Sequence, residues 1–424
     1  MLKMISENFL GWLTLLLIFF ITILIAKKDP KTISFLFVAL FLRSSFVILD
    51  QYFLTLPDST GDAVVFERRA FLYSQAFGLD IVFTFFSQDS FFISRLISVS
   101  YTILDRSELM AKMFSVGVGT GAIFLIYRLS LILWGSRTAL KAAWFATLFP
   151  SFILYSSLIL REVYVVFFLT YALIGCVNFI SKKNFFYFIQ SFFGFLIAAL
   201  FHGPLILGFF IFLIYIFLKI LKENNYFIRF KKKKLYLIFL LPILLLPIIT
   251  YLMGYYSIPK IGNISNFGNI KDKDKIELQK IEDRLIWKIK TATRSSGDRD
   301  TGAGYPSWTV PTNIIEIVYL APVRMTYFLY SPFPWDIKRF AHLIGLFDAF
   351  FYLYLSFCIV RNRKILYENP QTRFLIIILF MYIFAYSFGV GNFGTGVRHR
   401  LKFIGVLIAI AAPTIVKIKF TKIK

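Results

Sequence analysis

Long apolar runs recur along this 424-residue chain and constrain its fold more than any other feature. Each run is about 18 residues or longer, which lets a helix cross the ~30 Å hydrocarbon core of a bilayer. The hydrophobic fraction of 58% and the mean hydropathy of +0.72 agree. We therefore expect an all-α, polytopic membrane protein. Eleven transmembrane helices are expected, near residues 8–26, 33–55, 111–134, 140–160, 163–180, 185–202, 204–221, 235–254, 342–360, 373–392 and 401–416.

The net charge of +24 comes from Lys and Arg that gather in short segments between the apolar runs. Such segments remain in the cytoplasm. No nucleic-acid-binding motif accompanies the charge, so a nucleic-acid partner is not expected. The resulting orientation has the N-terminus outside and the C-terminus inside. The basic segments are Lys27–Lys31, Ser136–Lys141, Ser181–Lys183, Leu218–Lys234, Arg361–Lys364 and Lys417–Lys424.

This orientation makes residues 1–424 one multi-pass domain with two large outer segments, residues 57–109 and 254–335, and a basic cytoplasmic loop at 218–234. Interfacial helices are expected on the outer face. One is residues 63–77. Another is Ile314–Tyr330, which lies in the outer interface or re-enters the membrane, because a crossing there would move the basic loop after residue 360 outside. Two prolines should end that helix at residues 331–335.

The first outer segment carries four candidate site residues. The carboxylate of Asp62 could act as a general base, or it could cap the following helix. Glu67 lies five residues further on and is a second candidate carboxylate. With Arg68 and Arg69 it could instead form a solvated polar face, which is the favoured reading for Arg69.

Two clusters provide cations at the same outer face. The first is Arg161–Glu162, and the second is Arg398–His399–Arg400. A guanidinium binds phosphate through two hydrogen bonds, and the glycines at 391–396 suggest amide-rich turns beside the second cluster. For the first cluster the alternative is an ordinary interfacial ion pair. For the second it is an inverted topology at this point.

Five further residues within or beside the apolar runs also need an explanation. His202 could contact a phosphate or donate a proton, or it could be a simple turn residue. Arg324 needs a partner, and lipid phosphate could serve. Gly117 and Gly119 belong to a Gly-x-Gly-x-Gly pattern in a span, where close helix packing explains them better than nucleotide binding. Arg43 lies near the middle of a span with no evident partner.

An outer-face site with a carboxylate and several Arg and His side chains indicates an anionic, lipid-linked substrate. Nucleotide sugars are not available on that side of the membrane. The sequence shows no metal-ligand cluster, and no cofactor is expected.

Four segments resemble the GT-C superfamily of integral-membrane glycosyltransferases and the related O-antigen polymerases of the Wzy type. They are Gly61–Asp62–Ala63, Phe149–Pro150–Ser151 through Leu160–Arg161–Glu162, Ser331–Pro332–Phe333–Pro334–Trp335, and Gly394–Thr395–Gly396–Val397–Arg398–His399–Arg400.

The resemblance implies surface-polysaccharide synthesis at the periplasmic face of a bacterial inner membrane. The donor would be an undecaprenyl-linked saccharide, the acceptor another saccharide, and Asp62 the candidate base. Chain-length or assembly proteins are possible partners. A transporter or flippase for lipid-linked saccharides is the alternative, and a non-catalytic assembly partner is a third.

Overall fold

The computed structural model describes residues 2–85, 91–222, 283, 286–291, 303–338 and 340–415. These residues form helices and no β-strand, in agreement with the expected all-α class. They belong to two compact units. The first comprises Met1–Ser257, Leu355–Ile378 and Leu401–Lys424, and the second comprises Ile258–Tyr354 and Leu379–Arg400. The expected span at 235–254 and most of the segments 218–234 and 254–302 lie outside the described residues.

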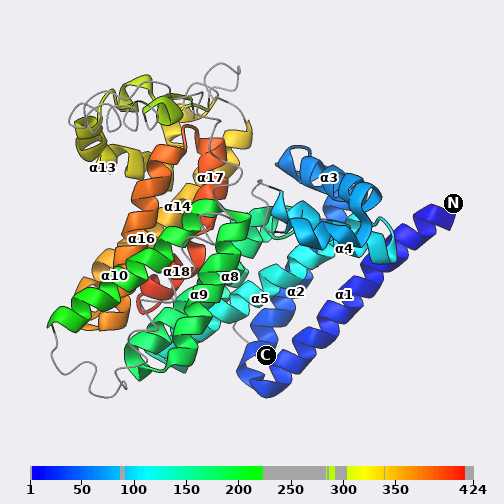
Figure 1. Cartoon of the computed structure of the whole chain (residues 1–424), viewed down its shortest axis with the longest axis horizontal. Coiled ribbons are helices and arrows are strands. Elements are labelled where there is room, and N and C mark those ends of the chain that lie inside the picture. The colour runs from blue at the N-terminus through cyan, green and yellow to red at the C-terminus, as the bar shows by residue number, and fades with distance from the viewer. Residues whose placement is uncertain are drawn as a thin grey trace, which may run out of the picture. The chain divides into compact units, whose positions relative to one another are not determined.

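The first unit is built around a long central helix, α5, which contacts α1, α2, α6, α8 and α18. In Figure 1, α8 and α9 lie side by side as an antiparallel pair. The helices of this unit are α1 (Leu2–Lys28), η1 (Pro30–Thr32), α2 (Ile33–Tyr52), α3 (Asp62–Phe77), η2 (Gly78–Thr84), α4 (Phe92–Leu104), α5 (Glu108–Trp134), α6 (Ser136–Thr147), α7 (Pro150–Tyr155), α8 (Arg161–Lys182), α9 (Phe185–Phe201), η3 (Gly203–Ile206), α10 (Leu207–Lys222), α15 (Arg363–Glu368) and α18 (Ile404–Ala411).

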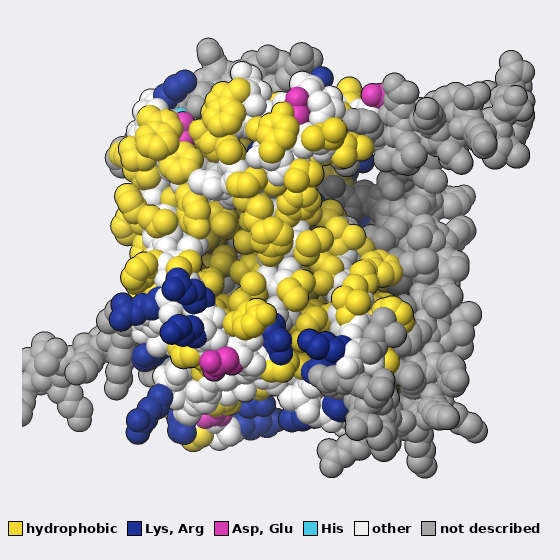
Figure 2. Space-filling model, turned by 90° about the vertical axis from the view of Figure 1, so that its left-hand side faces the viewer, with side chains coloured by type: hydrophobic (Ala, Val, Ile, Leu, Met, Phe, Trp, Pro, Cys, Tyr) yellow, Lys and Arg dark blue, Asp and Glu magenta, His cyan; other side chains and the backbone are white. Residues whose placement is uncertain are grey.

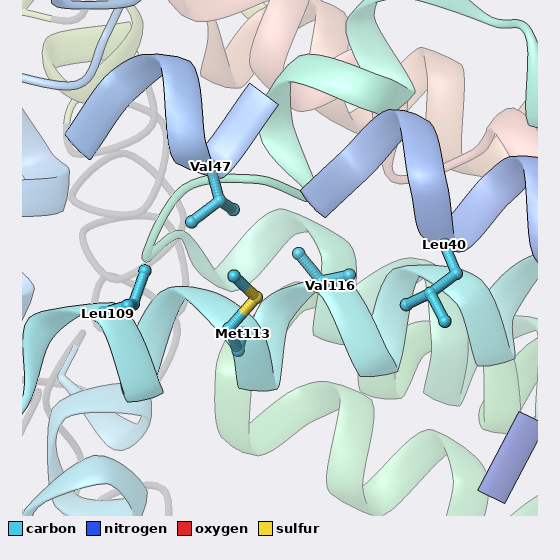
Figure 3. Close-up of a cluster of buried hydrophobic side chains, with 5 residues drawn as sticks. All are labelled: Leu40, Val47, Leu109, Met113 and Val116. Carbon is cyan, nitrogen blue, oxygen red and sulfur yellow. The ribbon is translucent and has the colours of Figure 1, made fainter. Parts of the chain in front are cut away.

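Buried aliphatic side chains join α2 to α5 (Figure 3). Leu40 and Val47 of α2 pack against Leu109, Met113 and Val116 of α5. The α2 pair is seven residues apart and the α5 residues are three or four apart, so each set lies along one face of its helix.

The three glycines of α5 allow close helix packing, as the sequence indicated. A Cβ atom at Gly117 would lie 3.1 Å from a side-chain atom of Ile18 on α1. A Cβ at Gly121 would lie 2.9 Å from Phe167 on α8. A Cβ at Gly119 would lie 2.6 Å from the Cβ of Ser156, which follows α7. The pattern therefore serves helix contact in three directions.

The expected span at 140–160 is not one helix. α6 ends at Thr147, and α7 begins at Pro150 and has only six residues. Proline lacks an amide hydrogen and disfavours a helical conformation in the residue before it; Phe149 is accordingly extended, with φ −71° and ψ 116°. Residues 151–160 are all buried, so this irregular backbone is enclosed by protein.

The expected span at 401–416 is also interrupted. Helix α18 runs only from Ile404 to Ala411, after a turn at residues 402–403. Pro413 follows its end and prevents continuation. The expected span at 185–202 corresponds to α9, which has 17 residues.

Seven described helices are long and apolar enough to cross a membrane. They correspond to seven of the expected spans, so the multi-pass class holds, whereas the count of eleven is not confirmed. The seven segments are Glu7–Lys28, Pro30–Tyr52, Glu108–Trp134, Arg161–Lys182, Gly203–Ile220, His342–Arg361 and Pro370–Gly389.

One face of the molecule carries a broad field of hydrophobic side chains with Lys and Arg gathered along one margin (Figure 2).

The second unit contains η4 (Ser307–Thr309), α13 (Ile314–Tyr330), η5 (Pro334–Asp336) and most of α17 (Phe393–Leu401). The boundary between the units falls within α14 (Phe340–Arg361) and α16 (Pro370–Gly389).

Helix α13 has the expected bounds and ends before the two prolines. One side of it exposes apolar residues, including Ile315, Val318 and Tyr319. The opposite side buries Ala321 against Ile289.

Candidate functional site

A buried charged group in the first unit brings two of the expected site residues together at the start of α8. Leu160 is extended, and α8 begins at Arg161 without a side-chain cap. Glu162 is fully buried, and Arg161 exposes 17% of its side chain. Arg161 Nε lies 4.0 Å from Glu162 Oε1, so the two residues form a long ion pair.

Lys402 is the member of this group that the sequence analysis missed. Its side chain is fully buried, and its Nζ lies 3.8 Å from Glu162 Oε1. The sequence signal was present, since Lys402 is a cation inside an apolar run and follows Arg400 by two residues. The sequence predicts an ordinary span at 401–416, and only the fold reveals that this run meets Glu162.

His202 completes the group and lies in the turn after α9. Its backbone N–H donates to the Ala198 carbonyl at 3.0 Å, and η3 follows directly. Burial and the positive charges of Lys402 and Arg161 lower the pKa of His202. The imidazole is therefore neutral at pH 7, and it can offer hydrogen bonds but no positive charge.

We call Arg161, Glu162, His202 and Lys402 the Glu162 cluster. In this cluster two cations, Arg161 and Lys402, share the buried carboxylate of Glu162. The formal charges leave one positive charge in excess. The N-terminus of α8 adds the positive end of a 22-residue helix dipole. Such an arrangement is suited to binding an anion such as phosphate.

Asp62 is exposed in the first turn of α3. The cap position is occupied by Gly61 and has no side-chain hydrogen bond, so the alternative of an Asp62 N-cap is wrong. A carboxylate in the first turn still interacts favourably with the helix dipole. Helix α3 packs on α4 and η2, which fixes its polar face relative to the rest of this segment.

Glu67 is buried on the other side of α3 and is engaged within the protein. Arg106 donates from Nε and Nη2 to the two carboxylate oxygens at 2.9 and 2.8 Å, and Tyr101 Oη donates at 3.0 Å. Burial and the Glu67 charge raise the pKa of Tyr101. Glu67 therefore does not belong to a solvated polar face. Arg68 and Arg69 are exposed, which agrees with such a face for these two residues.

Arg400 in the second unit has a structural environment in place of the expected phosphate contact. Its side chain is fully buried, and Nη2 lies 2.6 Å from Asp348 Oδ2. Nη1 donates to the carbonyls of Leu329 and Ser331 at 2.9 and 2.7 Å, and Nη2 also reaches the Gly345 carbonyl at 3.3 Å. These contacts leave the guanidinium no exposed surface for a substrate.

Arg324 also points into the protein and not toward lipid phosphate. It is fully buried, and its Nε donates to the Ser387 carbonyl at 2.9 Å. Nη2 donates to the Val390 carbonyl at 2.6 Å, and Nη1 to the Thr309 carbonyl at 3.2 Å. Backbone oxygens are the partners that the sequence could not identify. The residue ties α13 to the end of α16.

Arg398 and His399 are half-buried on α17, in contrast to Arg400. The His399 ring contacts Tyr386 edge to face at 5.7 Å. The glycines at 394 and 396 are helical and do not form the expected turns, because α17 begins at Phe393. Arg398 and His399 thus remain the accessible members of the expected basic cluster.

In comparisons with known proteins, no family model matches the chain, no curated protein matches it, and no solved structure matches its fold.

Proposed function

We propose that this chain is a membrane glycosyltransferase of bacterial surface-glycan assembly. It uses an undecaprenyl phosphate or pyrophosphate saccharide as donor and a second saccharide as acceptor, as an O-antigen or exopolysaccharide polymerase does. The observation that carries the proposal is the Glu162 cluster, an anion-attracting group of charges in a fold of apolar helices. Charged side chains buried among apolar helices are unfavourable and are usually functional.

In the proposed reaction, Arg161 and Lys402 bind the donor phosphate. The acceptor hydroxyl oxygen bonds to the anomeric carbon while the bond from that carbon to the phosphate oxygen breaks. Cations that hold the departing phosphate stabilise the charge that develops on it. Asp62 takes the proton of the acceptor hydroxyl. The site would face the periplasm, and no cofactor is required.

A transporter or flippase for lipid-linked saccharides is the second candidate function. Arg43 favours it, because this cation lies near the middle of a candidate span and is fully buried. The interruption between α6 and α7 also favours it, since transporters use broken helices at their substrate sites.

Mass spectrometry of polyprenyl-linked saccharides in a strain that lacks this gene tests the proposal. Accumulation of complete repeat units indicates a polymerase, and accumulation of a polyprenyl-phosphate monosaccharide indicates a single-sugar transferase. Complementation with the wild-type gene should reverse either change. Pools that match the parent strain at both faces of the membrane would reject the enzyme. Normal synthesis with units retained on the cytoplasmic face would support the transporter.

A further inference from the structure

Arg43 is a buried cation for which the proposed reaction gives no direct use. It lies near the centre of α2, within the 23-residue candidate span Pro30–Tyr52. A charge at such a position is unfavourable even on membrane-insertion scales. The side chain is fully buried, so it reaches neither lipid headgroups nor bulk water. In the described part of the chain, no carboxylate lies within ion-pair distance of it.

Besides a hydrogen bond from Nη1 to the Ala39 carbonyl of its own helix at 3.3 Å, Arg43 contacts the interrupted segment between α6 and α8. Its Nη1 donates to the carbonyl of Thr147, the last residue of α6, at 3.4 Å. Its guanidinium carbon lies 4.9 Å from the centre of the Phe152 ring in α7. In the connector after α7, the Ser157 hydroxyl donates to the Arg43 backbone carbonyl at 3.1 Å. The side chain of Arg43 therefore contacts the end of α6 and the ring in α7, and its backbone contacts the connector.

Two features of the surroundings accommodate this guanidinium. Gly119 of α5 faces the group, and a Cβ there would lie 3.3 Å from Arg43 Nε. A cation at the C-terminal end of α6 also has favourable interactions with the free carbonyls and dipole of that helix. Arg43 Nε and Nη2 have no acceptor among the described atoms, so the hydrogen bonding of this guanidinium is incomplete there.

We propose that Arg43 is a positioning residue for the Glu162 cluster. By holding the end of α6 and the Phe152 ring of α7, its side chain fixes where residues 151–160 place Arg161 and Glu162 at the start of α8. The inference rests on the proposed function only for the identity of the anion. The geometric claim is that removing Arg43 displaces the cluster.

The energetic consequence distinguishes a positioning role from general support of the fold. Because Arg43 has no anionic partner, replacing it by an apolar residue of similar length leaves no charge stranded. Exchanging a buried charge for a well-packed apolar side chain is often neutral or stabilising. Arg43→Met should therefore keep heat stability while losing anion binding, a combination that general support of the fold does not produce.

The experiment uses full-length protein purified in detergent. Undecaprenyl phosphate and inorganic pyrophosphate are the binding probes, and thermal unfolding is followed in parallel. Arg43→Met should bind both probes about tenfold more weakly with no loss of heat stability. Arg43→Lys retains a donor for the Thr147 carbonyl and should bind within about threefold of wild type. Arg128→Met is the matched control, since Arg128 lies in α5 but is exposed, and it should change neither measurement.

Wild-type binding by Arg43→Met would overturn the inference, and so would a binding loss that Arg43→Lys fails to rescue. If Arg43→Met does not accumulate, Phe152→Leu supplies the same test, because it weakens the contact between ring and cation without removing the charge. It should weaken probe binding, and unchanged binding would contradict the inference. Unaltered lipid-linked saccharides in the deletion strain would reject the glycosyltransferase but leave these binding results intact.

Discussion

Replacing Arg400 by Met should destabilise the protein strongly, because the residue is engaged entirely by protein acceptors. Its guanidinium pairs with Asp348 at 2.6 Å and donates to backbone carbonyls, with no exposed surface. The variant leaves the Asp348 carboxylate buried without its counter-charge. Breaking a buried pair in this way costs about 3–5 kcal/mol. That is a large part of an ordinary unfolding free energy of about 5–15 kcal/mol.

The assay measures abundance in the membrane fraction and unfolding of the purified protein in detergent. Arg400→Met should be scarce or should melt at a lower temperature. Adding Asp348→Leu removes the stranded charge and should recover part of the lost stability. Arg398→Met is the matched control. Its side chain is half-buried on the same helix, so its stability change should be small.

A direct phosphate-binding role for Arg400 predicts the opposite pattern. Arg400→Met would then be as abundant and heat-stable as wild type, with an increased KM for the lipid-linked donor. Failure of Asp348→Leu to restore any stability would also contradict the buried-pair reasoning. Either result would require a guanidinium that leaves its present contacts.

Three further predictions concern the proposed site and its surroundings. Asp62→Asn should abolish glycan synthesis at normal protein abundance, and normal glycan would remove Asp62 from the mechanism. Lys402→Met should raise the donor KM tenfold or more, whereas an unchanged KM would exclude the Glu162 cluster from donor binding. Glu67→Gln should lower the melting temperature, because Arg106 loses a buried anionic partner whose removal costs up to about 3 kcal/mol; an unchanged melting temperature would refute that role.

The apolar runs predicted helices well because length and hydropathy are local properties of the chain. Seven of the expected spans have helices of sufficient length, and α13 begins and ends where the sequence indicated. The interruption at residues 148–149 could also have been predicted, since Pro150 favours an extended residue before it. Hydropathy averaged over a window hides such a break, because Leu148 and Phe149 are as apolar as the helices on either side.

The candidate site was predicted less completely, because ionic partners are set by tertiary packing. Arg161 and Glu162 are adjacent in sequence, but the cation Lys402 joins them from a position 240 residues later in the chain, and the fold alone brings it there. Arg400 illustrates the reverse error. Its location beside Arg398 and His399 resembles a phosphate site, whereas Asp348 and three backbone carbonyls already fill its hydrogen-bonding capacity.

Charges at membrane depth therefore need a second criterion beyond their position in an apolar run, namely whether the protein itself satisfies them. Lys112 is satisfied, since its Nζ lies 2.9 Å from Asp50 and 2.8 Å from Glu108. Arg400 meets the criterion through Asp348. Lys402 and Arg161 lie 3.8 and 4.0 Å from the same oxygen of Glu162, so two cations share one carboxylate. The anion-binding proposal therefore rests on the place of these two cations at the positive end of the α8 dipole and not on the number of cations in the apolar runs.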